Sequence, residues 1–90
     1  MGENRWQVII HRKAEKTIKR LRGEMLDRIR QATRSLAENP RPVGYTKMMG
    51  YDNLYRIRVG DWHIIYAIED DELIVLVLEI APRGGIYRNY

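Results

Sequence analysis

The chain has 90 residues, of which 44% are hydrophobic and 31% charged, so it holds enough apolar material for one small core and is too apolar for a disordered chain. It has no cysteine, which excludes disulfides and thiolate chemistry, and no apolar run near the roughly 18 residues of a membrane span. We therefore expect a single cytoplasmic domain over residues 1–90 with no membrane contact. The net charge of +4 favours an anionic partner, such as nucleic acid or an acidic protein.

The first half of the chain is predicted to form one strand and two helices. Residues 6–10 alternate as a short strand, and apolar residues at helical spacing indicate a helix over residues 12–22 that ends at Gly23. The same spacing over residues 24–38 predicts a second helix, antiparallel to the first. The following segment, residues 39–44, contains two prolines and a glycine and is predicted to be a connector.

The second half is predicted to form three strands, over residues 54–59, 62–69 and 73–80, after a segment at 45–53 that shows no clear period. The last strand is almost continuously apolar, as expected of a strand that is covered on both faces or lies in the middle of a sheet. The predicted order is thus one strand, two helices and three strands.

A two-residue loop at Gly60-Asp61 joins the first two of these strands, and a short loop determines which residues face each other. The predicted pairs are Val59 with Trp62, Arg58 with His63, and Arg56 with Ile65. Because side chains alternate between the faces of a sheet, Arg56, Arg58 and His63 project together from one face, and aromatic and aliphatic side chains form part of the core on the other. Two cations and an imidazole gathered in this way are suited to binding phosphate.

Four segments of the chain carry a pattern beyond secondary structure. They are Lys47-Met48-Met49-Gly50, Leu54-Tyr55-Arg56-Ile57-Arg58, Gly60-Asp61-Trp62-His63-Ile64-Ile65-Tyr66 and Ala81-Pro82-Arg83-Gly84-Gly85-Ile86-Tyr87-Arg88. Their order and spacing together resemble the RelE branch of the RelE/ParE toxin superfamily, the toxins of type II toxin–antitoxin pairs. The resemblance covers nearly the whole chain and implies an α+β fold of the order β-α-α-β-β-β, with a helical hairpin packed on a mainly antiparallel four-stranded sheet.

The resemblance also implies an activity. Such a toxin is a metal-independent endoribonuclease without a cofactor, which cuts messenger RNA in the ribosomal A site, inhibits translation and is silenced by a cognate antitoxin in a hetero-oligomeric complex. The 2'-hydroxyl attacks the neighbouring phosphate and leaves a 2',3'-cyclic phosphate. This reaction needs a base for the 2'-hydroxyl, cations for the charge that develops on phosphate, and an acid for the departing 5'-oxygen.

The residues that the resemblance assigns to this reaction are basic or aromatic. They are Arg56 and Arg58, at positions commonly held by lysine or arginine, Arg83 after the last strand, and Tyr87 near the C-terminus. Lys47 and Arg88 are further candidates for contacts with RNA, with an unengaged lysine and a loose terminal arginine as the alternatives. Two histidines without cysteine make no convincing metal site.

His63 departs from the family pattern, which usually has arginine at this position. Arginine is a poor base because it is effectively always protonated, so Arg56 and Arg58 can clamp phosphate but offer no proton acceptor. The hypothesis is that His63 acts as general base or acid. An ordinary imidazole has a pKa of about 6.5, and adjacent cations disfavour its protonated form. Tyr87 is then its counterpart or a stacking platform for a nucleobase. The alternative is a histidine that only fills the surface of a weakened or inactive toxin.

Two other functions are compatible with the same fold. ParE-like relatives poison DNA gyrase by protein contact and need no catalytic residues. A catalytically degenerate toxin would serve only as the antitoxin's partner in a DNA-binding regulatory complex. The basic residues favour the nuclease, whereas the histidine in place of arginine at position 63 keeps the degenerate toxin open.

Overall fold

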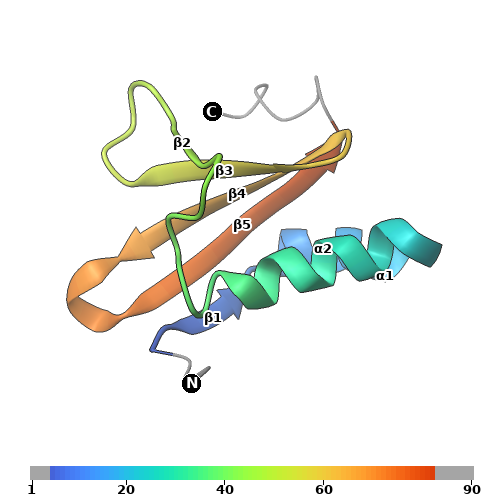
Figure 1. The fold of residues 1–90 in the computed structure, drawn as a ribbon, viewed down its shortest axis with the longest axis horizontal. Coiled ribbons are helices and arrows are strands. Elements are labelled where there is room, and N and C mark those ends of the chain that lie inside the picture. Colours follow the sequence, from blue (N-terminus) through green and yellow to red (C-terminus); the bar gives the residue numbers. More distant parts are fainter. Residues whose placement is uncertain (1–4, 83–90) are drawn as a thin grey trace.

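The structure is a computed structural model and describes residues 5–82 of the chain. Two helices lie on one side of a five-stranded sheet with the strand order β1-β5-β4-β3-β2 (Figure 1). In chain order the elements are β1 (Gln7–Ile10), α1 (Arg12–Arg20), α2 (Gly23–Ser35), β2 (Thr46–Lys47), β3 (Leu54–Val59), β4 (Trp62–Glu69), the short 3-10 helix η1 (Asp70–Glu72) and β5 (Ile74–Pro82). The α+β fold and the order of the predicted elements are confirmed.

Strand β2 adds a fifth strand to the four that were predicted. It has two residues, lies in the segment at 45–53 that shows no clear period, and pairs antiparallel to β3. Two residues are too few for the apolar and polar alternation by which a strand is identified in a sequence. The sheet therefore has five strands rather than four.

Both helices end earlier than the sequence predicts. Helix α1 ends at Arg20 because the backbone of Leu21 is extended, with φ −74° and ψ 153°. Helix α2 begins at Gly23, and beyond Ser35 the Leu36 amide donates to the carbonyl three residues back, the tighter geometry that is common at helix ends. Strands β3 and β4 have the predicted bounds, whereas β5 begins one residue later and ends two residues later than predicted.

Strand β5 has neighbours on both sides. Strand β1 pairs with its first half in parallel, and β4 pairs with it in antiparallel orientation along nearly its whole length. Strands β3 and β2 continue the sheet beyond β4, both antiparallel. This position inside the sheet accounts for the almost continuous run of apolar residues in β5.

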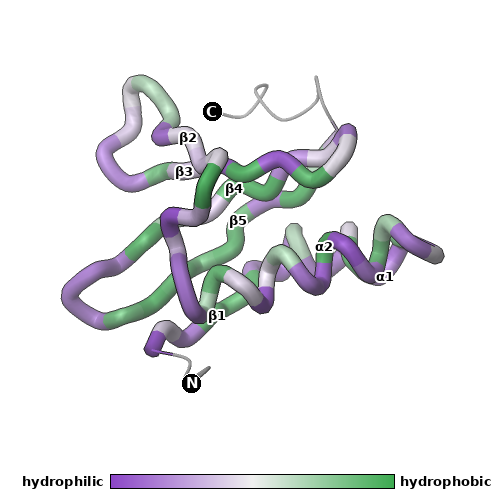
Figure 2. Tube along the Cα trace, viewed as in Figure 1, coloured by the Kyte–Doolittle hydropathy of each residue, from purple (hydrophilic) through white to green (hydrophobic). Residues whose placement is uncertain are grey.

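The main core lies between the sheet and the two helices. Helix α2 and the turn after it contribute the fully buried Ile29 and Leu36. Figure 2 shows hydrophobic stretches along β4 and β5, with a hydrophilic turn between them, and alternating hydropathy along β3. The core side chains of the hairpin include those predicted, namely Tyr55, Ile57, Val59, Ile64 and Tyr66, with Trp62 packed against them. In the described part of the chain, neither helix is long and apolar enough to cross a membrane.

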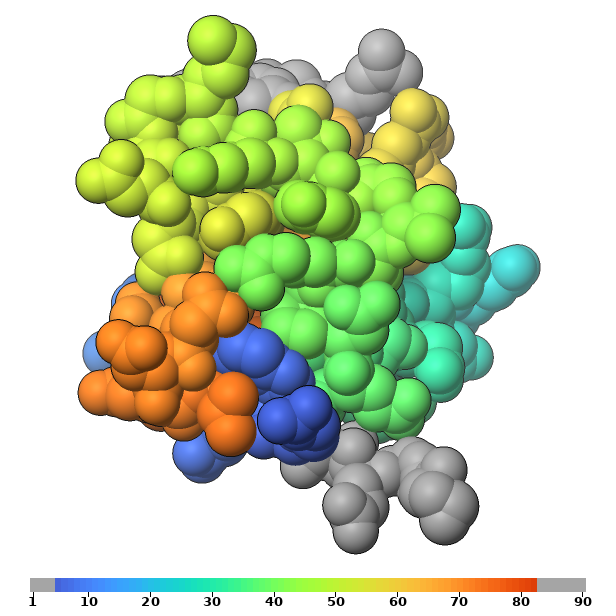
Figure 3. Space-filling view, turned by 60° about the vertical axis from the view of Figure 1, so that its left-hand side comes forward, coloured from blue at the N-terminus to red at the C-terminus, as the bar shows by residue number. Residues whose placement is uncertain are grey.

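The connector after α2 is tied to the sheet by two side chains. The hydroxyl of Tyr66 donates to the Pro40 carbonyl at 2.7 Å, and burial raises the pKa of this phenol above its ordinary value. The Arg41 guanidinium pairs with Asp70 at 3.1 Å and lies 5.4 Å from the centre of the Tyr55 ring. Figure 3 shows the result, with the connector in green beside the orange turn between β4 and β5 and the blue β1.

Candidate functional site

The β3–β4 hairpin has the predicted register. Gly60 turns the chain at φ 62°, a backbone conformation that glycine adopts without steric cost. The paired residues are Val59 with Trp62, Arg58 with His63, and Arg56 with Ile65. The structure therefore brings Arg56, Arg58 and His63 together on the face of the sheet away from the helices, which we call the outer face.

Two rows of side chains cross the outer face from β3 to β5. One row is Arg56, Ile65 and Glu79, and the next is Arg58, His63 and Ala81. Directly paired side chains on neighbouring antiparallel strands have Cβ atoms about 4.5–5.5 Å apart, so Arg58 and His63 are immediate neighbours. Met48, which follows β2, packs on Ile65 and forms a small second cluster with it.

The three predicted residues differ in their exposure. Arg58 is exposed, Arg56 is half-buried, and His63 is only 8% exposed. The Nε of Arg58 donates to the Gly60 carbonyl at 2.7 Å, which holds its guanidinium at the turn. The imidazole of His63 is thus buried within the outer face, whereas the guanidinium of Arg58 lies at its surface.

Glu79 is a buried acid on the outer face that the sequence interpretation overlooked. Val75 and Val77 point to the main core, and strict alternation would send Glu79 there too. The register between β4 and β5 shifts at Ile65/Tyr66, because Ile65 pairs with Glu79 and Tyr66 pairs with Val77. The extra residue between them is a β-bulge, which turns Glu79 to the outer face. A single acid in an apolar run was the signal in the sequence.

Within residues 5–82, the carboxylate of Glu79 has one ion-pair partner, Lys13. Glu79 is 6% exposed, and its Oε2 lies 3.2 Å from the Nζ of Lys13, in the first turn of α1. Its other oxygen, Oε1, is buried and has no hydrogen-bond partner among the described residues. Buried carboxylate oxygens are normally satisfied by a donor, so an unused acceptor here indicates a place for a further contact.

The remaining predicted site residues are not all brought to this face. In β2, Thr46 pairs with Arg56 and Lys47 pairs with Tyr55, so Lys47 is exposed on the side of the sheet opposite to Arg56. Arg83, Tyr87 and Arg88 lie outside the described residues. Within residues 5–82 there is no group of three or more side chains suited to hold a metal ion.

The outer face combines three chemical abilities. The guanidinium groups of Arg56 and Arg58 offer several N–H donors each and carry permanent positive charge, which suits them to phosphate oxygens. The imidazole of His63 has ring nitrogens that can accept or donate a proton. Glu79 adds a buried negative charge. The arrangement can therefore bind a phosphate and move a proton beside it.

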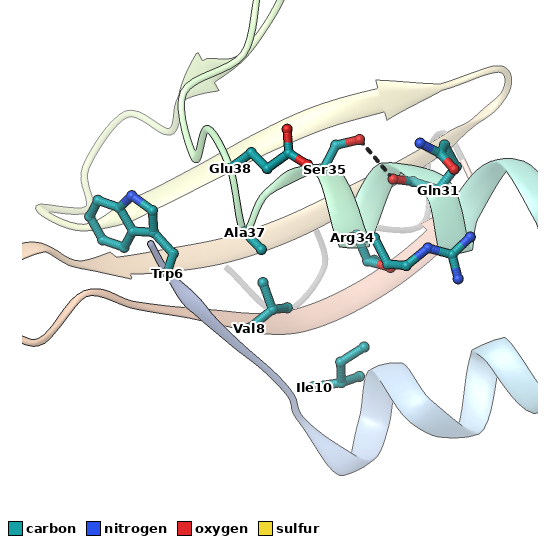
Figure 4. A pocket seen from close by; sticks show the side chains of 9 residues that line it. Trp6, Val8, Ile10, Gln31, Arg34, Ser35, Ala37 and Glu38 are labelled. Atoms are coloured by element: carbon teal, nitrogen blue, oxygen red, sulfur yellow. Dashed lines mark hydrogen bonds between the residues drawn. The ribbon is translucent and has the colours of Figure 1, made fainter. Parts of the chain in front are cut away.

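A separate groove lies on the other side of the molecule. It has a volume of about 490 Å³ and runs between β1 and α2, with Val8 and Ile10 on one wall and Gln31 and Arg34 on the other (Figure 4). Strands β1 and β3 are separated by β5 and β4 in the sheet, so the groove shares no residue with the outer-face rows.

Comparison with known proteins gives the family. A family model described as the ParE toxin of the type II toxin–antitoxin system parDE matches residues 8–87. The chain belongs to this family. The matched segment runs from β1 to beyond β5, so it contains both rows of the outer face.

Two curated relatives of the ParE-family chain carry RelE names. The candidate toxin RelE1 of Methanocaldococcus jannaschii is 28% identical over 88 residues, which cover 94% of this chain and 98% of the relative. The toxin RelE of Mycobacterium tuberculosis is 34% identical over 53 residues, which cover 59% of this chain and 55% of the relative.

Two solved structures with the same fold are complexes that contain a RelE protein. The archaeal RelE–RelB complex from Pyrococcus horikoshii matches with a TM-score of 0.79 at 27% identity, over 90% of this chain and 98% of the other. The intact E. coli RelBE toxin–antitoxin complex matches with a TM-score of 0.75 at 17% identity, over 88% and 98%, and this likeness concerns the fold alone. The chain is a RelE-like toxin of a toxin–antitoxin system.

Proposed function

We propose that this RelE-like toxin is a ribosome-dependent, metal-independent endoribonuclease that cuts mRNA in the A site and thereby inhibits translation. The observation that carries the proposal is the pairing of Arg58 with the buried His63 on the outer face, with Arg56 one row away. Two phosphate-binding cations thus lie beside a group that can move a proton. A protein that acts by contact alone has no need of this combination.

In the proposed reaction, Arg56 and Arg58 stabilise the negative charge that builds up on the scissile phosphate. The 2'-oxygen forms a bond to phosphorus while its proton passes to His63, and the bond from phosphorus to the 5'-oxygen breaks. The 5'-oxygen takes a proton from an acid, so the products are a 2',3'-cyclic phosphate and a 5'-hydroxyl. Tyr87 is the candidate acid or stacking residue and Arg83 a third cation, both on the basis of sequence.

The proposed partners are a cognate antitoxin, the ribosome and mRNA, in the cytoplasm. The Pyrococcus horikoshii and E. coli proteins of similar fold are toxin–antitoxin complexes, which supports a hetero-oligomeric complex with an antitoxin here. Lys47 and Arg88 stay candidates for contacts with RNA in addition to Arg56 and Arg58.

Primer extension on a defined mRNA, translated in a reconstituted system, tests the nuclease. The parent is expected to produce breaks at fixed codon positions, and Arg56→Ala and His63→Ala are each expected to cleave about 100-fold more slowly, the usual size for loss of one charge-stabilising or proton-transferring group. Arg30→Ala, an exposed cation on α2, is the matched control and should cleave at the parental rate.

The outcomes separate the roles of these residues. A parental rate for His63→Ala would remove the role of His63 in proton transfer while leaving the nuclease intact. A parent that leaves no codon-positioned breaks would reject the nuclease altogether.

A second candidate function follows from the family model, which is named for the ParE toxin. ParE-like relatives poison DNA gyrase, so a gyrase supercoiling assay is the matching test. Inhibition of supercoiling without mRNA breaks would favour this function. A chain that shows neither effect, and still binds its antitoxin, would be the catalytically degenerate toxin.

A further inference from the structure

The buried carboxylate of Glu79 lies close to His63 on the outer face. Glu79 pairs with Ile65, which is two residues along β4 from His63, and the two side chains therefore occupy diagonal positions on neighbouring strands. Diagonal neighbours in an antiparallel pair lie about 7–8 Å apart, within reach of long side chains. Both residues are buried, so little water screens the charge of one from the other.

The other charged groups around Glu79 are cations. Lys13 of α1 binds Oε2, and Arg56 and Arg58 of β3 stand in the same two rows. Strands β1 and β2 place only uncharged residues on this face, namely Gln7, Ile9 and Thr46, with Met48 after β2. Among the described residues, Glu79 is thus the one negative charge in the two rows.

We propose that Glu79 is a positioning residue for His63: its buried carboxylate, aimed at the outer face by the β-bulge, holds the imidazole as a usable proton acceptor beside Arg56 and Arg58 of β3. Arg56 and Arg58 alone would disfavour the imidazolium that forms when His63 accepts a proton. A fixed negative charge on the other side of the imidazole stabilises that imidazolium, as the carboxylate does behind the histidine of serine hydrolases. The unused Oε1 is the acceptor that an imidazole N–H would reach when the ring carries its proton.

This inference rests on the proposed nuclease for its catalytic meaning, but its effect on His63 can be measured without any cleavage. A purely structural explanation competes with it, because the pair of Glu79 and Lys13 also joins α1 to β5. Loss of either partner would then weaken the fold in the same direction. In the proposed role, by contrast, removal of the acid and removal of the lysine act on His63 with opposite signs.

NMR titration of the full-length chain is the decisive measurement. The chain has only two histidines, so His11→Gln identifies the signal of His63. Glu79→Gln is expected to lower the pKa of His63 by about one pH unit, a conservative figure for a unit charge about 7–8 Å away at an effective dielectric constant of about 20. Lys13→Gln removes a cation and leaves the acid, so it is expected to raise that pKa by a few tenths of a unit.

Two variants serve as controls. Asp71→Asn removes a carboxylate from η1, at the opposite end of β4 from His63, and should leave the titration of His63 unchanged. Glu79→Asp keeps the charge and should restore most of the parental value. If Glu79→Gln does not fold, Lys13→Gln still decides, because the Lys13 side chain is about half exposed and its loss leaves the acid in place.

The proposal is overturned if Glu79→Gln leaves the titration of His63 unchanged, or if Lys13→Gln lowers its pKa as Glu79→Gln does. Where the parent cleaves mRNA, the limb of the pH–rate profile that reports His63 should move to lower pH in Glu79→Gln by the same amount as the NMR value. A parent without cleavage would refute the proposed nuclease and leave the NMR result for Glu79 to stand by itself.

Discussion

The two faces of the β3–β4 hairpin differ in what surrounds the side chains of the same two strands. On the helix side, Tyr55, Ile64 and Tyr66 belong to the core that the sheet forms with the two helices and are almost completely buried. On the outer face, Arg58 is exposed and Arg56 half-buried, beside the buried His63. Strand alternation therefore places the side chains that stabilise the fold on one face and those suited to chemistry on the other. Neighbouring residues of one strand can thus have different roles. Substitutions on each face test whether stability and activity depend on different side chains.

The largest effect is expected on the helix side. Ile64→Ala removes a fully buried side chain and should lower the free energy of unfolding by about 4 kcal/mol, because it loses apolar burial and leaves a cavity. Urea unfolding followed by circular dichroism measures this loss. Cleavage should fall only in proportion to the unfolded fraction. A stable Ile64→Ala protein with strongly reduced cleavage would contradict the separation between the two faces.

A smaller effect of the opposite kind is expected at Arg58. Arg58→Ala should reduce mRNA cleavage about 100-fold, equivalent to about 2.7 kcal/mol of transition-state stabilisation, and change the free energy of unfolding by no more than about 0.5 kcal/mol. Arg58→Lys keeps the charge but loses the two-pronged contact to phosphate, so its cleavage rate should lie between the rates of the parent and of Arg58→Ala. Parallel rate and unfolding measurements on the three proteins check this. Equal losses of stability and activity would show that Arg58 supports the hairpin instead.

The smallest effect is expected at Tyr66, on the helix side. Tyr66→Phe leaves the Pro40 carbonyl without its 2.7 Å donor and should cost about 1.5 kcal/mol of unfolding free energy at neutral pH. Burial raises the pKa of Tyr66, with Arg41 acting more weakly in the other direction, so the folded chain keeps its phenol proton when the unfolded chain releases it. The parent should therefore lose stability above about pH 10, and its advantage over Tyr66→Phe should shrink there. Denaturant unfolding at several alkaline pH values measures this; a constant difference would contradict it.

The hairpin could be predicted because its determinants are local. The two-residue loop Gly60-Asp61 fixes the register of the hairpin. That register predicts Arg56, Arg58 and His63 on one face, and the structure has the same pairing. The ends of β3 and β4 were equally well marked by alternation. The identity of the family likewise follows from the order of short motifs along the chain, and the match over residues 8–87 agrees with it.

What the sequence could not provide depends on contacts between distant segments. The side on which Lys47 lies is decided by the pairing of β2 with β3, and two residues give no pattern from which to read it. The orientation of Glu79 depends on a bulge in the pairing of β5 with β4, which shifts the alternation by one residue. A run of apolar residues does not reveal such a shift, because apolar side chains can lie on either face of β5.

The parallel pairing of β1 with β5 has a consequence for the synthesis of the chain. Gln7 is paired with Ile74, so the first strand has no place in the sheet until the last strand has been made. Contacts so far apart in sequence form late in folding because a long loop must close first. β5 also provides the third residue of each outer-face row, Glu79 in one and Ala81 in the other. The outer face therefore cannot be completed until β5 has left the ribosome, which delays the assembly of the candidate site until all the strands from β1 to β5 have been made.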